Sequence, residues 1–274
     1  MSGVDFTRNA AVYDDRHGAA IDAALAARLI DEAGLARGST ALDVGAGTGR
    51  VAVPLAAHGC RVVAVDLAAA MLERLRAKAD TAGGQPDARR RVLAAVASAG
   101  ALPFRAEVFD AVIVARVLYL VEEWRGALDE AARVLRRGGV LLHEWGNGDA
   151  DEPWVEVREK ARELFERAGV AAPFHPGARS EADVDRHLSA RGFVRGSTLS
   201  WPSGATTTIG RFLDRIESGE CSYTWSVPDA AQRACLPALR AWAEARFGRD
   251  FAFAAPRAIS WTIHAASKLP TAIR

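Results

Sequence analysis

Three glycines at alternate positions, directly after an apolar run, constrain the fold of this 274-residue chain more than any other feature. The run starts at Ala41 and ends at Val44, and Gly45, Gly47 and Gly49 follow it. Glycine adopts the positive φ angles of a sharp turn and lets a ligand approach bare backbone. We predict a buried strand, a sharp turn, and a helix starting near Gly49 whose unpaired N–H groups face a carboxylate or phosphate.

Short β-branched runs alternate with helical patterns up to about residue 145. Such runs are typical of parallel strands buried on both faces. Five strands alternating with helices predict a doubly wound α/β sheet whose strand carboxyl ends share one edge. The predicted strands are 41–44, 61–66, 92–97, 109–114 and 140–144, the predicted helices are 21–33, 51–58, 68–79 and 124–135, and 136–139 is predicted as a turn.

The pattern changes after Gly146, where helical stretches outnumber strands. We expect two final strands to extend the sheet, and the helical pieces 151–180 and 206–247 to form a lid over its ligand-binding edge. The predicted helices here are 153–168, 181–190, 207–216 and 229–247, and the predicted strands are 193–201 and 259–265.

Composition excludes several classes of function. With 35 basic and 34 acidic residues the net charge is +1, so we expect neither a nucleic-acid nor a membrane partner. Three cysteines without CxxC spacing suit a reducing cytoplasm, and the six histidines lack the spacing of metal ligands. We see no signal peptide and no apolar stretch long enough for a transmembrane helix.

The glycine spacing also limits which kind of nucleotide the turn can bind. In the dinucleotide fingerprint the third glycine comes three residues after the second, whereas Gly49 comes two residues after Gly47. Asp66 ends the next predicted strand, where a carboxylate can accept from both hydroxyls of a ribose. Each such bond is worth roughly 1.5–3 kcal/mol. The alternative is that Asp66 only caps the helix that follows it.

These features resemble class I S-adenosylmethionine-dependent methyltransferases. Ala41–Arg50 resembles their first motif, Asp66 sits where their ribose-binding acid sits, and 102–104, 109–110 and 133–139 match later motifs. The resemblance covers roughly residues 10–145. It implies a Rossmann-like, mainly parallel seven-stranded sheet, S-adenosylmethionine as methyl donor and S-adenosylhomocysteine as product.

The resemblance also implies where the donor is bound. Gly45, Ala46 and Gly47 would pass under the methionine and ribose, Asp66 would hold the ribose hydroxyls, and Leu67 and Met71 would pack on the adenine. Ser98 stands where many relatives have an acid that accepts from the adenine amino group. Because a hydroxyl accepts only weakly, we expect the Ala99 N–H to carry more of that contact.

Two further donor contacts are carried over by position. Arg116 falls at the position where, in members of the family, the backbone contacts the methionine part of the cofactor. Tyr13 resembles an N-terminal aromatic residue that closes over the cofactor. Tyr13 is equally explained as an aromatic staple in an N-terminal helix. We therefore divide the single domain into cofactor-covering helices 1–40, an α/β core 41–146, and a lid with the last two strands 147–274.

Methyl transfer is an in-line displacement, and a base is needed only if the nucleophile must first lose a proton. Candidate catalytic residues are His143, Glu144 and Tyr119, and His17 and His175 are further possible bases. Tyr119 and Trp145 are our best candidates for an aromatic substrate pocket, although core packing would explain them too.

We expect a small-molecule methyltransferase that is a monomer or a homodimer. A protein that binds S-adenosylmethionine without transferring its methyl group is an alternative from another class. An NAD(P)-dependent oxidoreductase would bind its cofactor at the same edge of such a sheet, but the glycine spacing does not fit that class of enzyme.

Overall fold

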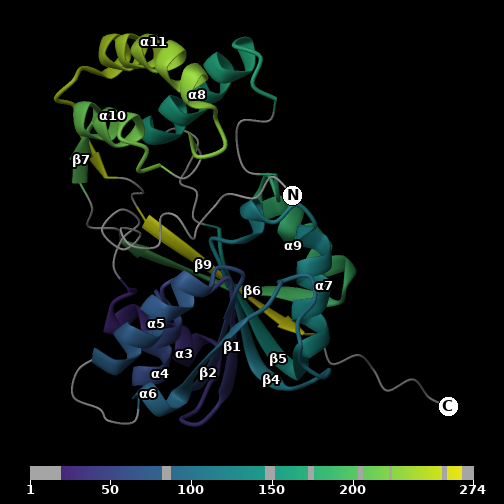
Figure 1. Ribbon diagram of the computed structural model, residues 1–274. Helices are drawn as coiled ribbons and strands as arrows, with labels where there is room; N and C mark the ends of the chain where they lie inside the picture. The colour runs from purple at the N-terminus through teal and green to yellow at the C-terminus, as the bar shows by residue number, and fades with distance from the viewer. Residues whose placement is uncertain are drawn as a thin grey trace. The chain divides into compact units, whose positions relative to one another are not determined.

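A seven-stranded sheet in the order β3-β2-β1-β4-β5-β9-β6 organises the structure, a computed structural model (Figure 1). The structure describes residues 20–81, 88–145, 152–171, 176–202, 206–221, 224–254 and 258–266. The strands are β1 (Thr40–Val44), β2 (Arg61–Asp66), β3 (Val92–Val96), β4 (Phe109–Ala115), β5 (Leu135–Glu144), β6 (Phe193–Pro202), β7 (Thr206–Thr208), β8 (Ala252–Ala254) and β9 (Ala258–Ala266). The helices are α3 (Ala23–Glu32), α4 (Ala52–Ala57), α5 (Ala69–Thr81), α6 (Ala88–Arg91), α7 (Trp124–Val134), α8 (Pro153–Arg167), α9 (Glu181–Ala190), α10 (Ile209–Glu217) and α11 (Asp229–Phe247), and a 3-10 helix spans Leu118–Leu120.

The described chain divides into two compact units. The sheet unit contains the described residues of 20–145, 177–199 and 260–266, and the helical unit contains those of 152–176 and 200–259. β6 and β9 contribute residues to both units. The predicted lid thus corresponds in part to a separate unit, and its role as a lid stays a prediction.

The sheet is mainly parallel, as predicted, because β1 to β5 all run in one direction. β9 joins β5 antiparallel and β6 lies beside β9, which confirms that two late strands extend the sheet. In Figure 1, α3, α4 and α5 cover one face of the sheet, and α7 and α9 cover the other. Val44, Val65 and Val114 lie in register, each at or one residue before the end of its strand, so the carboxyl ends of these three neighbouring parallel strands form one edge.

Two local predictions were wrong. Residues 136–139 form no separate turn, because β5 already begins at Leu135 and the irregularity is absorbed where its pairing with β4 shifts between Phe109 and Ala111. The helix predicted over 207–216 begins at Ile209 instead, and the β-branched residues before it pair as β7 with β8. Thr208 then caps α10, since its hydroxyl accepts from the Arg211 N–H.

The helical unit has its own apolar core. Phe165 of α8, Leu213 of α10 and Leu239 of α11 are all buried in one cluster. The β7–β8 ribbon joins that core through Phe253, whose ring meets Phe212 edge to face at 6.0 Å. Trp154 and Trp242 pack against the same cluster, so core packing accounts for these two aromatic residues.

Candidate functional site

The glycine turn after β1 is held by the end of β2. The N–H groups of Gly45 and Ala46 both donate to the Val65 carbonyl, at 2.8 and 3.0 Å. The φ angle of Gly45 is +70°, a conformation that side chains rarely adopt. A Cβ placed there would also lie 2.5 Å from Cγ2 of Val117, so the segment after β4 packs directly against the turn. Only glycine allows this approach.

The helix after the turn is shorter and better capped than expected. α4 begins at Ala52 rather than near Gly49, and the Ala52 N–H donates to the Asp43 carboxylate at 3.1 Å. The prediction that this helix offers unpaired N–H groups to a ligand was therefore wrong for Ala52. Burial raises the pKa of Asp43 to about 7. The sequence signal for Asp43 is an acid in an apolar strand just before a glycine turn.

Asp66 touches the glycine turn and also caps the next segment. One carboxylate oxygen accepts from the Gly47 N–H at 2.8 Å, and the other accepts from the Ala68 N–H at 2.9 Å. Burial raises the pKa of Asp66, while these N–H groups oppose that rise. The capping alternative is therefore present in the structure, and the same carboxylate lies beside the turn where a ligand would pass.

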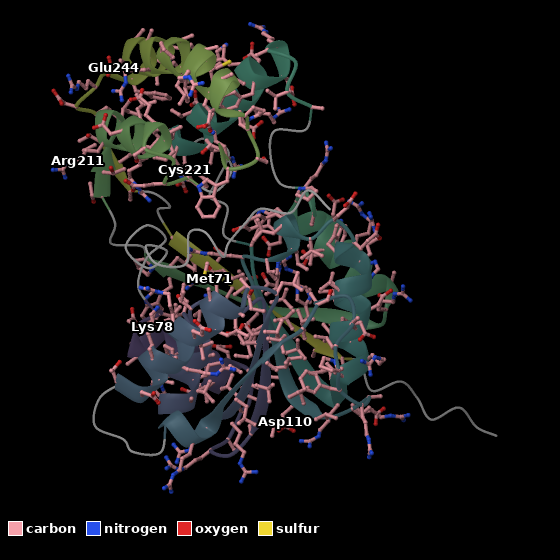
Figure 2. The ribbon with its side chains drawn as sticks, in the orientation of Figure 1. Met71, Lys78, Asp110, Arg211, Cys221 and Glu244 are labelled. Atoms are coloured by element: carbon pink, nitrogen blue, oxygen red, sulfur yellow. The ribbon has the colours of Figure 1, made fainter. Side chains whose placement is uncertain are left out.

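The two residues predicted to pack on adenine differ in exposure. The Leu67 side chain is 72% exposed, whereas Met71 is buried beside Ala68. Figure 2 labels Met71 and Lys78 on α5. Lys78 donates to the Thr48 hydroxyl at 3.0 Å and so ties α5 to the glycine turn. An exposed leucine directly after Asp66 offers an apolar surface at the carboxyl edge of the sheet.

Ser98 is exposed and closes its own tight turn. Its hydroxyl accepts from the Gly100 N–H at 3.3 Å, and its carbonyl accepts from the Ala101 N–H. The preceding Ala97 N–H donates to the Asp66 carbonyl at 3.1 Å, which brings this turn next to the acid. Ala99 packs against the sheet core from the same turn. The predicted adenine contacts therefore lie near Asp66.

Glu144, predicted as a candidate base, is fully buried at the end of β5 and paired with two arginines. Arg50 donates to one carboxylate oxygen, and Arg116 donates to the other at 2.5 Å. The Arg116 N–H also donates to the Glu144 carbonyl at 2.9 Å, and its φ of +56° is unusual for a side-chain-bearing residue. Each oxygen of this carboxylate therefore already accepts from an arginine.

The other catalytic candidates form an aromatic group. The rings of Tyr119 and Trp145 meet edge to face at 6.1 Å, and the His143 ring lies 6.0 Å from Trp145. His143 is buried, and burial lowers its pKa to about 3. Its Nδ1 has no hydrogen-bond partner in the described part of the chain. The ring is therefore neutral near neutral pH.

Hydrogen bonds tie the later motifs to one another and to the sheet. Arg133 donates to the carbonyls of Leu102 and Phe104, and Glu130 accepts from the Leu102 N–H. Asp110 accepts from the Thr40 N–H at 2.7 Å and pairs with an arginine of β5. Asp110, labelled in Figure 2, lies at the start of β4. Asp66 lies at the end of the parallel strand β2, so the two acids are at opposite ends of the strands.

Three predicted residues, Tyr13, His17 and His175, lie outside the described residues. Within the described ranges, no group of three or more His, Cys, Asp or Glu side chains could hold a metal ion. In the same part of the chain, no helix is both long and apolar enough to cross a membrane.

A methyltransferase-domain family model matches residues 42–143. An uncharacterized methyltransferase of Mycobacterium tuberculosis is 30% identical over 185 residues, which cover 64% of this chain and 70% of that protein. An uncharacterized protein of the same organism is 40% identical over 113 residues, 41% of this chain. That match spans only 39% of the relative's own length.

Solved structures show the same fold. A methyltransferase candidate of Bacillus halodurans has a TM-score of 0.58 at 23% identity and covers 88% of this chain and 97% of that chain. A geranyl diphosphate methyltransferase in complex with its methyl donor has a TM-score of 0.52 at 17% identity, covering 90% and 86%. The [4+2]-cyclase SpnF has a TM-score of 0.55 at 18% identity, covering 90% and 82%.

Proposed function

We propose a methyl-transfer function for this chain, because it belongs to the class I S-adenosylmethionine-dependent methyltransferase family. In the proposed reaction the methyl group of S-adenosylmethionine passes to a small molecule by in-line displacement, which leaves S-adenosylhomocysteine. The observation that carries the donor assignment is the hydrogen bond from Gly47 to Asp66 beside the exposed Leu67. It joins the glycine turn, a carboxylate and an apolar surface at one sheet edge.

The residues at this edge fit the donor. The backbone at Gly45 carries no side chain, and a Cβ there would collide with Val117. Asp66 provides carboxylate oxygens for ribose hydroxyls. Leu67 provides an exposed apolar face for the adenine, and the donor supplies an electrophilic methyl group on a sulfonium. Loss of that positive charge during transfer favours a dry, apolar surrounding.

The acceptor side of the site is aromatic. Tyr119 and Trp145 follow the ends of β4 and β5, next to the edge that holds Asp66 on β2. Such a surface suits a flat or apolar small molecule, and the near-neutral net charge gives no attraction to nucleic acid. A monomer or homodimer in the cytoplasm belongs to the same proposal.

Neither candidate base among the described residues is a strong base, so we expect the methyl acceptor to need little or no deprotonation. Glu144 is engaged by two arginines, and His143, with a pKa near 3, is a weak base. A nitrogen or another atom that is nucleophilic before deprotonation fits these side chains better than an alcohol does.

A methyl-transfer assay tests this function. The purified chain is incubated with donor carrying a labelled methyl group and with a set of small metabolites. We expect labelled product and one S-adenosylhomocysteine for each methyl group transferred. A chain that binds S-adenosylhomocysteine but never forms it would instead support non-methyl chemistry; a [4+2]-cyclase shares this fold. Tight binding of NADH and none of S-adenosylhomocysteine would revive the oxidoreductase.

A further inference from the structure

Glu144 links three loops at the carboxyl edge of the sheet. It ends β5, whereas Arg50 follows the glycine turn after β1 and Arg116 follows β4. Each arginine takes a different oxygen of the one carboxylate. Glu144 is fully buried, and the arginine side chains are only 18% and 28% exposed. These pairs therefore differ from surface ion pairs, which water and salt largely screen.

This group lies beside the turn that would carry the donor. Val117, the residue after Arg116, packs on Gly45, so the arginine's backbone is next to the turn. Asp43 lies close enough for the charges of Arg50 and Glu144 to act on it. Two guanidinium groups thus share one fully buried carboxylate at the place where the first strand ends. Arg116 is the more exposed of the two arginines.

We propose that Glu144 is a positioning residue that holds Arg116 toward the carboxylate of the donor's amino-acid end. The inference rests on the proposed function, because it concerns the same donor. A planar guanidinium suits a carboxylate, which is the only anionic group of the donor. The bond from Arg116 Nε to Glu144 holds the guanidinium, and the bond from the Arg116 N–H to the Glu144 carbonyl holds its backbone. Both are in place before the ligand arrives, so less freedom is lost on binding.

Calorimetric titration with three ligands tests this assignment. S-adenosylhomocysteine has the carboxylate, its decarboxylated analogue keeps the amine but lacks the carboxylate, and 5′-methylthioadenosine lacks both. We expect Glu144→Gln and Arg116→Gln to weaken S-adenosylhomocysteine by about 10- to 100-fold. Both variants should bind the other two ligands within about twofold of the wild type. Arg116→Lys should recover part of the loss, because the charge remains.

Arg137→Gln is the matched control, since it removes an exposed pair with Glu107 and should change no affinity. Equal losses for all three ligands, or no loss for any, would overturn the assignment and leave the group a structural ion-pair cluster. If Glu144→Gln does not fold, Arg116→Gln decides alone, because that side chain is partly exposed. A wild type that binds none of the three ligands contradicts the proposed function itself, which is a different result.

Discussion

Nε2 of His264 lies 3.3 Å from Oδ1 of Asp185, between β9 and α9. Both atoms are buried and have no hydrogen bond of good geometry in the described part of the chain. Burial and the nearby Arg195 lower the pKa of His264 to about 4. His143, close enough on the same sheet to be influenced by His264, has a pKa lowered to about 3. Two neutral histidines are thus enclosed next to the α/β core.

Acid should destabilise the fold through these histidines. The unfolded chain binds their protons near pH 6.5, whereas the folded chain binds them only near pH 3–4. Their contribution to the free energy of unfolding is therefore present above pH 6.5 and is lost as the pH falls. The loss is about 1.4 kcal/mol for each unit by which a pKa is lowered. We expect urea unfolding to show this loss between pH 6.5 and 5, and His264→Gln to reduce its slope. A slope unchanged in both His264→Gln and His143→Gln would contradict the assignment.

Asp43 should make the fold less stable as the pH rises, which is the opposite of the effect of the two histidines. Its folded pKa of about 7 exceeds the unfolded value of 3.8, so its contribution is present at low pH and is lost as the pH rises toward 7. Asp43→Asn removes the buried charge and can still accept from the Ala52 N–H. We expect this variant to gain stability relative to the wild type between pH 5 and 8 in urea unfolding. Asp43→Ala, which loses the cap, should be less stable by about 1 kcal/mol at pH 5.

Asp66 should matter for donor binding. Asp66→Ala removes the carboxylate expected to hold the ribose, and we predict a loss of about one to three decades in affinity for S-adenosylhomocysteine by calorimetry. Asp31→Ala, which removes an exposed acid of α3, is the control. Equal affinities in the wild type and Asp66→Ala would leave Asp66 with its capping role alone.

Gly177 should tolerate no side chain. Its N–H donates to the Tyr119 carbonyl at 2.9 Å, and a Cβ there would lie 2.0 Å from the Leu118 carbonyl oxygen. We expect Gly177→Ala to lower the free energy of unfolding by at least about 1–3 kcal/mol in thermal or urea unfolding. Gly126→Ala is the control, because nothing lies within 4 Å of that position in α7. It should be neutral or stabilising by about 0.5–1 kcal/mol.

Most of the sheet could be predicted because its strands carry their own signal. A run such as 61–66 is rich in β-branched residues and ends on an acid, and periodicity alone predicts α11 with its observed bounds. β7 could not be found in this way, because three threonines next to a helix fit either element. Only their pairing with Ala252–Ala254, distant in the chain, selects the strand.

The site was less predictable than the fold. The glycine turn and Asp66 were visible as a local pattern, and their contact follows from the pairing of β1 with β2. The pairing of Glu144 with Arg50 and Arg116 joins residues far apart in sequence. Nothing in the spacing of these residues indicates this pairing, and so the sequence suggests Glu144 only as a candidate base, a role that stays a prediction.

The order β5-β9-β6 has a consequence for how the chain matures during synthesis. β6 is synthesised well before β9, but β9 is its neighbour in the sheet. The backbone of β6 can therefore pair only after β9, the last described strand, has been synthesised. α8 likewise packs against α11, which follows it only after residues 168–228, so this contact forms late in synthesis. The first five strands can pair as they emerge, whereas both the sheet edge and the helical core depend on the final quarter of the polypeptide. Loss of β9 would leave an unpaired strand at that edge, the kind of surface through which nascent chains aggregate.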